Sequence, residues 1–160
     1  MSLLPNVTYT CINCLAFVIK RGRLGMYTKE LLQDTRDLLY PFTASKLKES
    51  KKNTLKDFVS VAGQFGVSHM LVFSQTDKAC YLRLIKNPKG PTITFKINEY
   101  SLAKDVIKYQ QQHKRYSKIF SKELQNAPLL IMNGFAQRPD NDAYKIVSLM
   151  LQSLFPPIKV

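Results

Sequence analysis

Cys11 and Cys14 are separated by two residues, the spacing of half a structural zinc site. Such a site needs four ligands, and the remaining candidates in the sequence are Cys80, His69 and His113. These three residues stand singly and supply no second pair of ligands. We therefore expect no metal ion and no cofactor, and we expect three free thiols in a reducing, intracellular compartment.

The sequence contains no arrangement of residues that is typical of a catalytic centre. GQFGVSH lacks the lysine and the hydroxyl residue that follow the second glycine of a phosphate-binding loop, and NPKGPT is too short to form one. His69 lies in the apolar stretch VSHMLVFS, which favours a hydrogen-bonded strand histidine over a catalytic base. Asp34 and Asp37 are one turn apart on a solvated helix face. We therefore expect neither enzymatic activity nor a small-molecule substrate.

The chain is strongly basic, with 24 Lys and Arg against 11 Asp and Glu and a formal net charge of +13. Such a charge attracts polyanions, either a nucleic acid or an acidic membrane surface. A membrane-surface protein needs a basic amphipathic helix, whereas the best amphipathic stretch, residues 142–155, has only Lys145 as a cation. The N-terminal stretch is unlike a signal peptide, because its basic residues follow its apolar residues. We therefore expect no membrane partner.

The basic residues are concentrated in three segments. The first places its lysines within eleven positions with Glu49 as the single acid among them (Lys46, Lys48, Lys51, Lys52 and Lys56), and the helix expected to follow offers free backbone amides to a phosphate. The second lies on consecutive expected strands and the turn between them (Arg83, Lys86, Lys89 and Lys96). The third surrounds Tyr116 (Lys114, Arg115 and Lys118).

Any one of these segments is typical of an ordinary solvated surface. Three of them with so few acids nearby favour a surface that binds a polyanion, with RNA and an acidic protein partner as the alternatives. Tyrosines such as Tyr81 offer rings for stacking on unpaired bases, although packing explains them equally well.

Hydrophobic periodicity predicts the elements that must position these residues. Strands are expected at residues 14–20, 42–48, 67–74, 79–86, 92–98 and 127–135. Helices are expected at residues 27–40, 55–65, 101–112 and 142–155, with Thr54 as the N-cap of the second. Residues 113–126 are expected to form a loop or a frayed helix. Strands that alternate with helices and then follow one another directly indicate an α/β (α+β) fold, a mixed sheet packed with helices.

Four stretches of the sequence resemble Brix-domain ribosome assembly factors of the Peter Pan (Ssf-type) branch. They are NPKGPTITFKINEYSLAKDV, YPFTASKLKESKKNTLKDFVSVAGQFGVSHMLVFS, APLLIMNGF and LMLQSLFPPIKV. The stretch AFVIKRGRLG is similar to the first strand and basic turn of that family. The resemblance implies that residues 15–160 form the N-terminal half of a Brix domain, like the anticodon-binding domains of some aminoacyl-tRNA synthetases. Residues 1–14 are then an N-terminal extension, and the chain stops before the second half.

The resemblance also implies a non-enzymatic factor that binds precursor rRNA of the large (60S) ribosomal subunit in the nucleolus or nucleus. Its further partners are other assembly factors and proteins of the pre-60S particle. The residues expected to contact RNA are Arg21, Arg23, Lys46, Lys48, Lys51, Lys52, Lys56, Arg83, Lys86, Lys89, Gly90, Pro91, Thr92 and Lys96. Gly90 and Pro91 have the alternative role of shaping the corner of their turn. The alternative function is a protein-interaction scaffold within the pre-ribosome that binds an acidic partner with little direct RNA contact.

Overall fold

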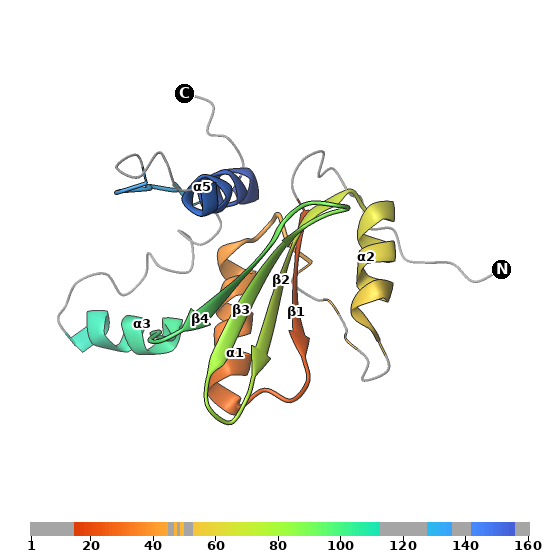
Figure 1. The fold of residues 1–160 in the computed structure, drawn as a ribbon. Coiled ribbons are helices and arrows are strands. Elements are labelled where there is room, and N and C mark those ends of the chain that lie inside the picture. Colours follow the sequence, from red (N-terminus) through yellow and green to blue (C-terminus); the bar gives the residue numbers. More distant parts are fainter. Residues whose placement is uncertain are drawn as a thin grey trace.

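Four strands form a single mixed sheet in the computed structural model of the chain (Figure 1). The structure describes residues 15–44, 47, 49, 53–112, 128–135 and 142–155. The strands lie side by side in the order β1 (Leu15–Arg21), β2 (Val67–Gln75), β3 (Cys80–Lys86) and β4 (Thr92–Ile97). β1 runs parallel to β2, whereas β3 is antiparallel to both β2 and β4. The predicted α+β fold with a mixed sheet is therefore confirmed.

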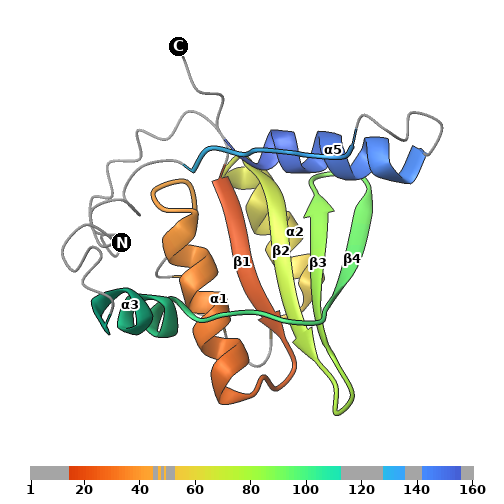
Figure 2. The same ribbon diagram turned by 90° about the vertical axis from the view of Figure 1, so that its left-hand side faces the viewer.

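Helices cover both faces of the sheet (Figure 2). The described helices are α1 (Met26–Leu38), α2 (Leu55–Gln64), α3 (Ala103–Gln112) and α5 (Asp142–Leu154). α1 and α5 pack on one face, and α2 packs on the opposite face. α3 lies beside α1, where the Asp34 carboxylate accepts a hydrogen bond of 2.8 Å from the Ala103 amide. Within the described ranges, none of the helices has the length and apolar character needed to cross a membrane.

Alternate residues of each strand enter the two halves of the core. On the side of α1 and α5, Val18 and Phe73 are buried together with Met150 of α5. On the side of α2, Phe17 is buried together with Phe58 of that helix. Burying one such side chain contributes about 1.5–3 kcal/mol to stability. From Ala16 onward, even-numbered residues of β1 therefore face α1, and odd-numbered residues face α2.

The outer edge of β1 is closed by hydrogen bonds from other parts of the chain. The Ala16 amide donates to the Phe42 carbonyl at 2.8 Å, and the Thr43 hydroxyl donates to the Ala16 carbonyl at 2.8 Å. The Arg36 guanidinium donates to the Val18 carbonyl through Nε at 3.1 Å and through Nη2 at 2.7 Å. These bonds occupy backbone groups that a neighbouring strand would otherwise use.

Glu49 completes the closure of this edge. Its Oε2 accepts a hydrogen bond of 3.1 Å from the Lys20 amide, and its Oε1 lies 2.6 Å from Nη2 of Arg36. The side chains of Arg36 and Glu49 are each only 9% exposed, so this ion pair is buried. An exposed strand edge is a template for pairing with another chain, and β1 is protected from such pairing.

The sequence correctly predicts most of these elements. The expected helices form, and Thr54 caps α2 in a capping box with Asp57. Within the stretch expected as a strand at residues 42–48, Thr43 forms one isolated parallel bridge with Ala16. Residues 45, 46 and 48 of that stretch, and the loop or frayed helix expected at residues 113–126, lie outside the described residues.

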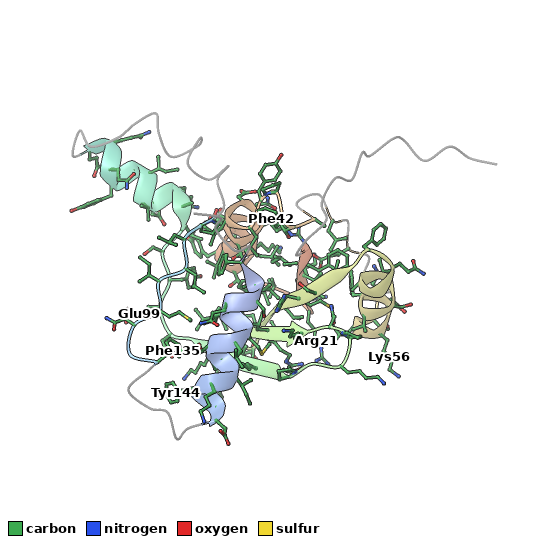
Figure 3. The ribbon with its side chains drawn as sticks, turned by 90° about the horizontal axis from the view of Figure 1, so that it is seen from above. Arg21, Phe42, Lys56, Glu99, Phe135 and Tyr144 are labelled. Atoms are coloured by element: carbon green, nitrogen blue, oxygen red, sulfur yellow. The ribbon has the colours of Figure 1, made fainter. Side chains whose placement is uncertain are left out.

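The strand expected at residues 127–135 is wrong, because residues 128–135 form neither a strand nor a helix. Apolar content favoured a strand there, but a strand also needs a hydrogen-bonding neighbour, which periodicity cannot supply. The side chains of Leu129 and Ile131 are 67% and 81% exposed. The segment instead contacts α5 through Phe135, whose ring lies edge-on to the Tyr144 ring with centroids 6.2 Å apart (Figure 3).

Candidate nucleic-acid interface

Charge is sorted between the strands and the helices. The four strands carry five charged residues, and all of them are cations: Lys20, Arg21, Arg83, Lys86 and Lys96. The four described helices carry six Lys or Arg and six Asp or Glu, so their formal charges cancel. The sheet is therefore a source of positive potential that the described helices do not neutralise.

Three of the strand cations face the same side of the sheet as α2. The register pairs Arg21 with Ser74, Ser74 with Tyr81, and Tyr81 with Lys96, so these residues form one row across the sheet. Arg83 lies two residues beyond Tyr81 on β3 and faces the same side. Neighbouring strands lie ~4.8 Å apart, so the backbones of Arg21 and Lys96 are ~14 Å apart.

The helix α2 covers β1 and β2 on this side, and no described helix lies over β4 there. We call this surface the open face and define it by six residues: Arg21, Ser74, Tyr81, Arg83, Thr94 and Lys96. Arg21, Thr94 and Lys96 are exposed, and the other members are half-buried. Cations and hydroxyl groups bind phosphates, and an aromatic ring stacks on a base, so the open face combines the groups that bind single-stranded nucleic acid.

Lys56 extends this surface onto the first turn of α2, and Figure 3 shows both Lys56 and Arg21 on the α2 side of the molecule. The N-terminus of α2 is already occupied by the protein's own groups. The Asp57 amide donates to Thr54 Oγ1 at 3.4 Å, and the Thr54 amide donates to Asp57 Oδ2 at 2.7 Å. The hydrogen bonds from the Thr54 backbone and side chain lower the pKa of Asp57. Because this carboxylate repels a phosphate, we assign any anion contact here to the exposed Lys56 rather than to the helix amides.

The turn between β3 and β4 lies at the other end of the sheet from the Arg21 row. Lys86 faces α5 rather than the open face, and its Nζ donates to Ser153 Oγ at 3.4 Å. A Cβ atom on Gly90 would lie 2.6 Å from the Lys86 Cβ and 2.9 Å from the Lys86 carbonyl oxygen. The Pro91 carbonyl accepts a hydrogen bond of 3.1 Å from the Lys86 amide. Gly90 and Pro91 therefore shape the turn, while Lys89 is exposed on it.

His69 is a buried strand histidine, as the sequence predicts. Its Nδ1 lies 2.8 Å from Ser68 Oγ, and its Nε2 lies 3.0 Å from Ser153 Oγ. Burial, and secondarily the positive charge of Lys86, lower the pKa of His69 to about 4. The ring is therefore neutral at pH 7, and it joins β2 to α5.

The described residues contain no group of three His, Cys, Asp or Glu side chains that is placed to hold a metal ion. His69 and Cys80 belong to rows of the sheet that are six residues apart, or ~20 Å along the strands. Cys80 is a free, half-buried thiol. The remaining candidate ligands Cys11, Cys14 and His113 lie outside the described residues.

The residues expected to contact RNA thus fall into separate groups. Arg21, Lys56, Arg83 and Lys96 lie on the α2 side, whereas Lys86, Lys89, Gly90, Pro91 and Thr92 lie at or near the β3–β4 turn. Arg23 is exposed in the loop after β1. Lys46, Lys48, Lys51 and Lys52, together with Lys114, Arg115 and Lys118, lie outside the described residues. Ser74 and Thr94 were not identified from the sequence, because only the strand register brings them beside the cations.

Comparison with known proteins gives consistent matches over most of the chain. A family model described as "Brix domain" matches residues 22–160. The chain is 41% identical over 145 residues to the Mus musculus "Suppressor of SWI4 1 homolog", an alignment that covers 91% of this chain and 30% of that protein. It is 39% identical over 145 residues to the Arabidopsis thaliana "Peter Pan-like protein", with 91% of this chain and 40% of that protein covered.

The Saccharomyces cerevisiae "Ribosome biogenesis protein SSF2" is 39% identical over 155 residues, with 89% of this chain and 34% of that protein covered. The chain therefore spans about a third of the length of these relatives. The division into an extension of residues 1–14 and a domain from residue 15 onward stays a prediction.

Proposed function

Because the chain belongs to the Brix domain family, we propose that it is a non-enzymatic ribosome biogenesis factor that binds precursor rRNA during large-subunit assembly. The name of the Saccharomyces cerevisiae relative, a ribosome biogenesis protein, supports the coarse part of this proposal. Its partners are then precursor large-subunit rRNA and other assembly factors of the pre-60S particle. A role in that particle places the chain in the nucleolus or nucleus.

The proposal of RNA binding is supported by the unequal distribution of charge between the strands and the described helices. A basic protein whose cations are merely solubilising would distribute them over strands and helices alike. Here the strands carry cations and no acid, while the described helices are neutral in sum. Arg21, Arg83 and Lys96 then meet on one face with the Tyr81 ring in the row between two of them.

Binding through this surface depends steeply on salt. Arg21, Lys56, Arg83 and Lys96 together with Lys46, Lys48, Lys51 and Lys52 supply ~8 phosphate contacts, and each contact to a single strand adds about 0.7 to the salt slope. Affinity for precursor rRNA is then expected to fall on the order of a thousandfold between 50 and 200 mM salt.

The test compares two variants of equal charge by UV crosslinking with sequencing and by salt titration. Arg83→Gln with Lys96→Gln removes cations from the open face, whereas Lys29→Gln with Lys108→Gln removes exposed cations from α1 and α3. We expect the first variant to lose crosslinks to large-subunit precursor RNA and to lower the salt slope by about 1.4, because two phosphate contacts are lost. The second variant is expected to keep both at the level of the unchanged chain.

A third variant, with Ala at Lys46, Lys48, Lys51 and Lys52, tests the lysine segment separately. Equal loss of crosslinks from the open-face and control variants would contradict a specific RNA site on the open face. Weak, diffuse crosslinking that is the same for every variant would favour the alternative function, a scaffold that reaches the pre-ribosome through an acidic protein partner.

A further inference from the structure

The two edges of the sheet differ in how their backbone groups are occupied. The outer edge of β1 is closed by Phe42, Thr43, Arg36 and Glu49, as described above. β4 is the opposite edge strand, and no described residue donates to or accepts from its outer side. Among the described residues, one edge of the sheet is therefore protected and the other is open, although an open edge carries a risk of uncontrolled pairing.

The register identifies which groups of β4 are available. The Lys86 amide donates to the Pro91 carbonyl at 3.1 Å, so the pair formed by these two residues is a hydrogen-bonded pair of the antiparallel ladder. Hydrogen-bonded and non-hydrogen-bonded pairs alternate along such a ladder. Thr92, Thr94 and Lys96 consequently direct their backbone N–H and C=O groups outward, away from β3.

The helix α5 forms an apolar ledge over this edge. Its C-terminal half packs on the sheet through the buried Met150 and Leu154, and its N-terminal half extends past β4 (Figures 2 and 3). Ile146 of this half is 40% exposed, and Leu149, just past the middle of the helix, is 63% exposed. Figures 2 and 3 show that α5 crosses the strands at the end of the sheet where β4 begins. A strand placed beside β4 would therefore bring the side chain nearest Ile93 under this ledge, and its other side chains on the same face would lie beside the half-buried Phe95 and Ile97.

We propose that the outer edge of β4 accepts an extended segment of a protein partner, in which apolar residues alternate with acidic residues. The partner's backbone bonds to Thr92, Thr94 and Lys96, in the manner of strand addition to an open sheet edge. Its apolar side chains lie beside Ile93, Phe95 and Ile97, with α5 above the first of them. Its acidic side chains lie beside Lys96 on the open face, where the strands carry no acid of their own. This inference rests on the edge groups and does not depend on RNA binding.

A second copy of the chain fits this edge poorly. Pairing two β4 strands in antiparallel register would bring the Lys96 cations of both copies to the same short ladder with no acid between them. Like charges on neighbouring strands destabilise such pairs, and an edge lysine is a common obstacle to self-pairing. An acidic partner removes this repulsion.

The experiment uses the full chain and a synthetic peptide of alternating Val and Glu as the probe, with amide hydrogen exchange as the readout. We expect the peptide to slow exchange at the amides of Thr92, Thr94 and Lys96 at least tenfold. The same peptide with N-methylated backbone amides is expected to give no protection, since it cannot form the ladder. Thr94→Pro removes one outward N–H without touching the bonds to β3, and is expected to abolish the protection, whereas Thr94→Ala retains it.

Three results would overturn the proposal. The first is no protection of these amides at millimolar peptide, and the second is equal protection by the N-methylated peptide. The third is protection without peptide that increases with protein concentration, because a second copy would then occupy the edge. If Thr94→Pro fails to fold, the two peptides on the unchanged chain still decide the question. Loss of RNA crosslinks in the open-face variant is measured separately, so failure of either proposal is distinguishable from failure of the other.

Discussion

The buried His69 makes the stability of this fold depend on pH, in a way that one substitution can isolate. The ring lies between Ser68 and Ser153 and is 1% exposed. Burial and the nearby Lys86 cation lower its pKa to about 4, whereas an unfolded histidine has a pKa of about 6.5. Between these two values, the unfolded chain binds a proton at His69 that the folded chain does not bind. The free energy of unfolding therefore decreases as the pH falls through this window.

The magnitude follows from the distance between the pH and the two pKa values. A pH of 5 lies about 1.5 units below the pKa of the unfolded histidine, so that histidine is protonated. It also lies above the pKa of the folded histidine, which is still mostly neutral. Each unit is worth about 1.4 kcal/mol, so the chain should lose about 2 kcal/mol of stability from His69 alone between pH 8 and pH 5. The pKa of Asp57 is lowered from a value that is already acidic, so its contribution is lost mainly below this window.

The assay is urea unfolding at pH 8 and pH 5 for the unchanged chain and for His69→Gln, which keeps a hydrogen-bonding side chain but does not titrate. The difference between the two proteins in their pH 8 to pH 5 loss should be about 2 kcal/mol, whatever the substitution itself costs at pH 8. Lys86→Met should show a smaller loss than the unchanged chain, because it removes one cause of the low pKa. Parallel stability curves for His69→Gln and the unchanged chain would show that the ring is not held neutral by its surroundings.

Glu49→Ala should lower the free energy of unfolding by about 3 kcal/mol, because Arg36 would keep a buried charge without its partner. A loss of less than about 1 kcal/mol in urea unfolding would contradict a buried ion pair. Gly90→Ala should lower the free energy of unfolding in the same assay, because the new Cβ would lie 2.6 Å from the Lys86 Cβ. Unchanged stability would show that the backbone of the turn shifts to make room for the Cβ at no cost. Gly63→Ala is the matched control, with no atom within 4 Å of its Cβ in α2, and should raise stability by about 0.5–1 kcal/mol.

Local patterns in the sequence were sufficient to predict the elements that depend on local physics. Alternation of apolar and polar residues predicted β4, and the Thr54 signal predicted the start of α2. His69 was interpreted correctly from its apolar neighbours, because a histidine in a buried strand has to find hydrogen-bonding partners within its own fold.

Features that depend on pairing between distant segments were not predictable in the same way. The row from Arg21 to Lys96 depends on the order of the four strands in the sheet and on the register in which they pair. The periodicity of a single strand carries no information on either. Lys86 was grouped with Arg83, although the two residues are three positions apart on β3 and therefore point to opposite faces of the sheet. Lys86 points toward α5. Residues 128–135 have the composition of a strand but lie beside no strand with which they pair among the described residues.

The separation of charge between strands and helices has a kinetic consequence. The open face gathers three strand cations, while the described helices are neutral in sum, so charge is unevenly distributed over the described residues. An approaching polyanion then exerts a torque on the molecule as well as an attraction. The chain should therefore arrive with the open face already turned toward its target, which raises the association rate at low ionic strength. Because the Debye length shortens to ~8 Å at physiological salt, this orientation acts only over the last part of the approach.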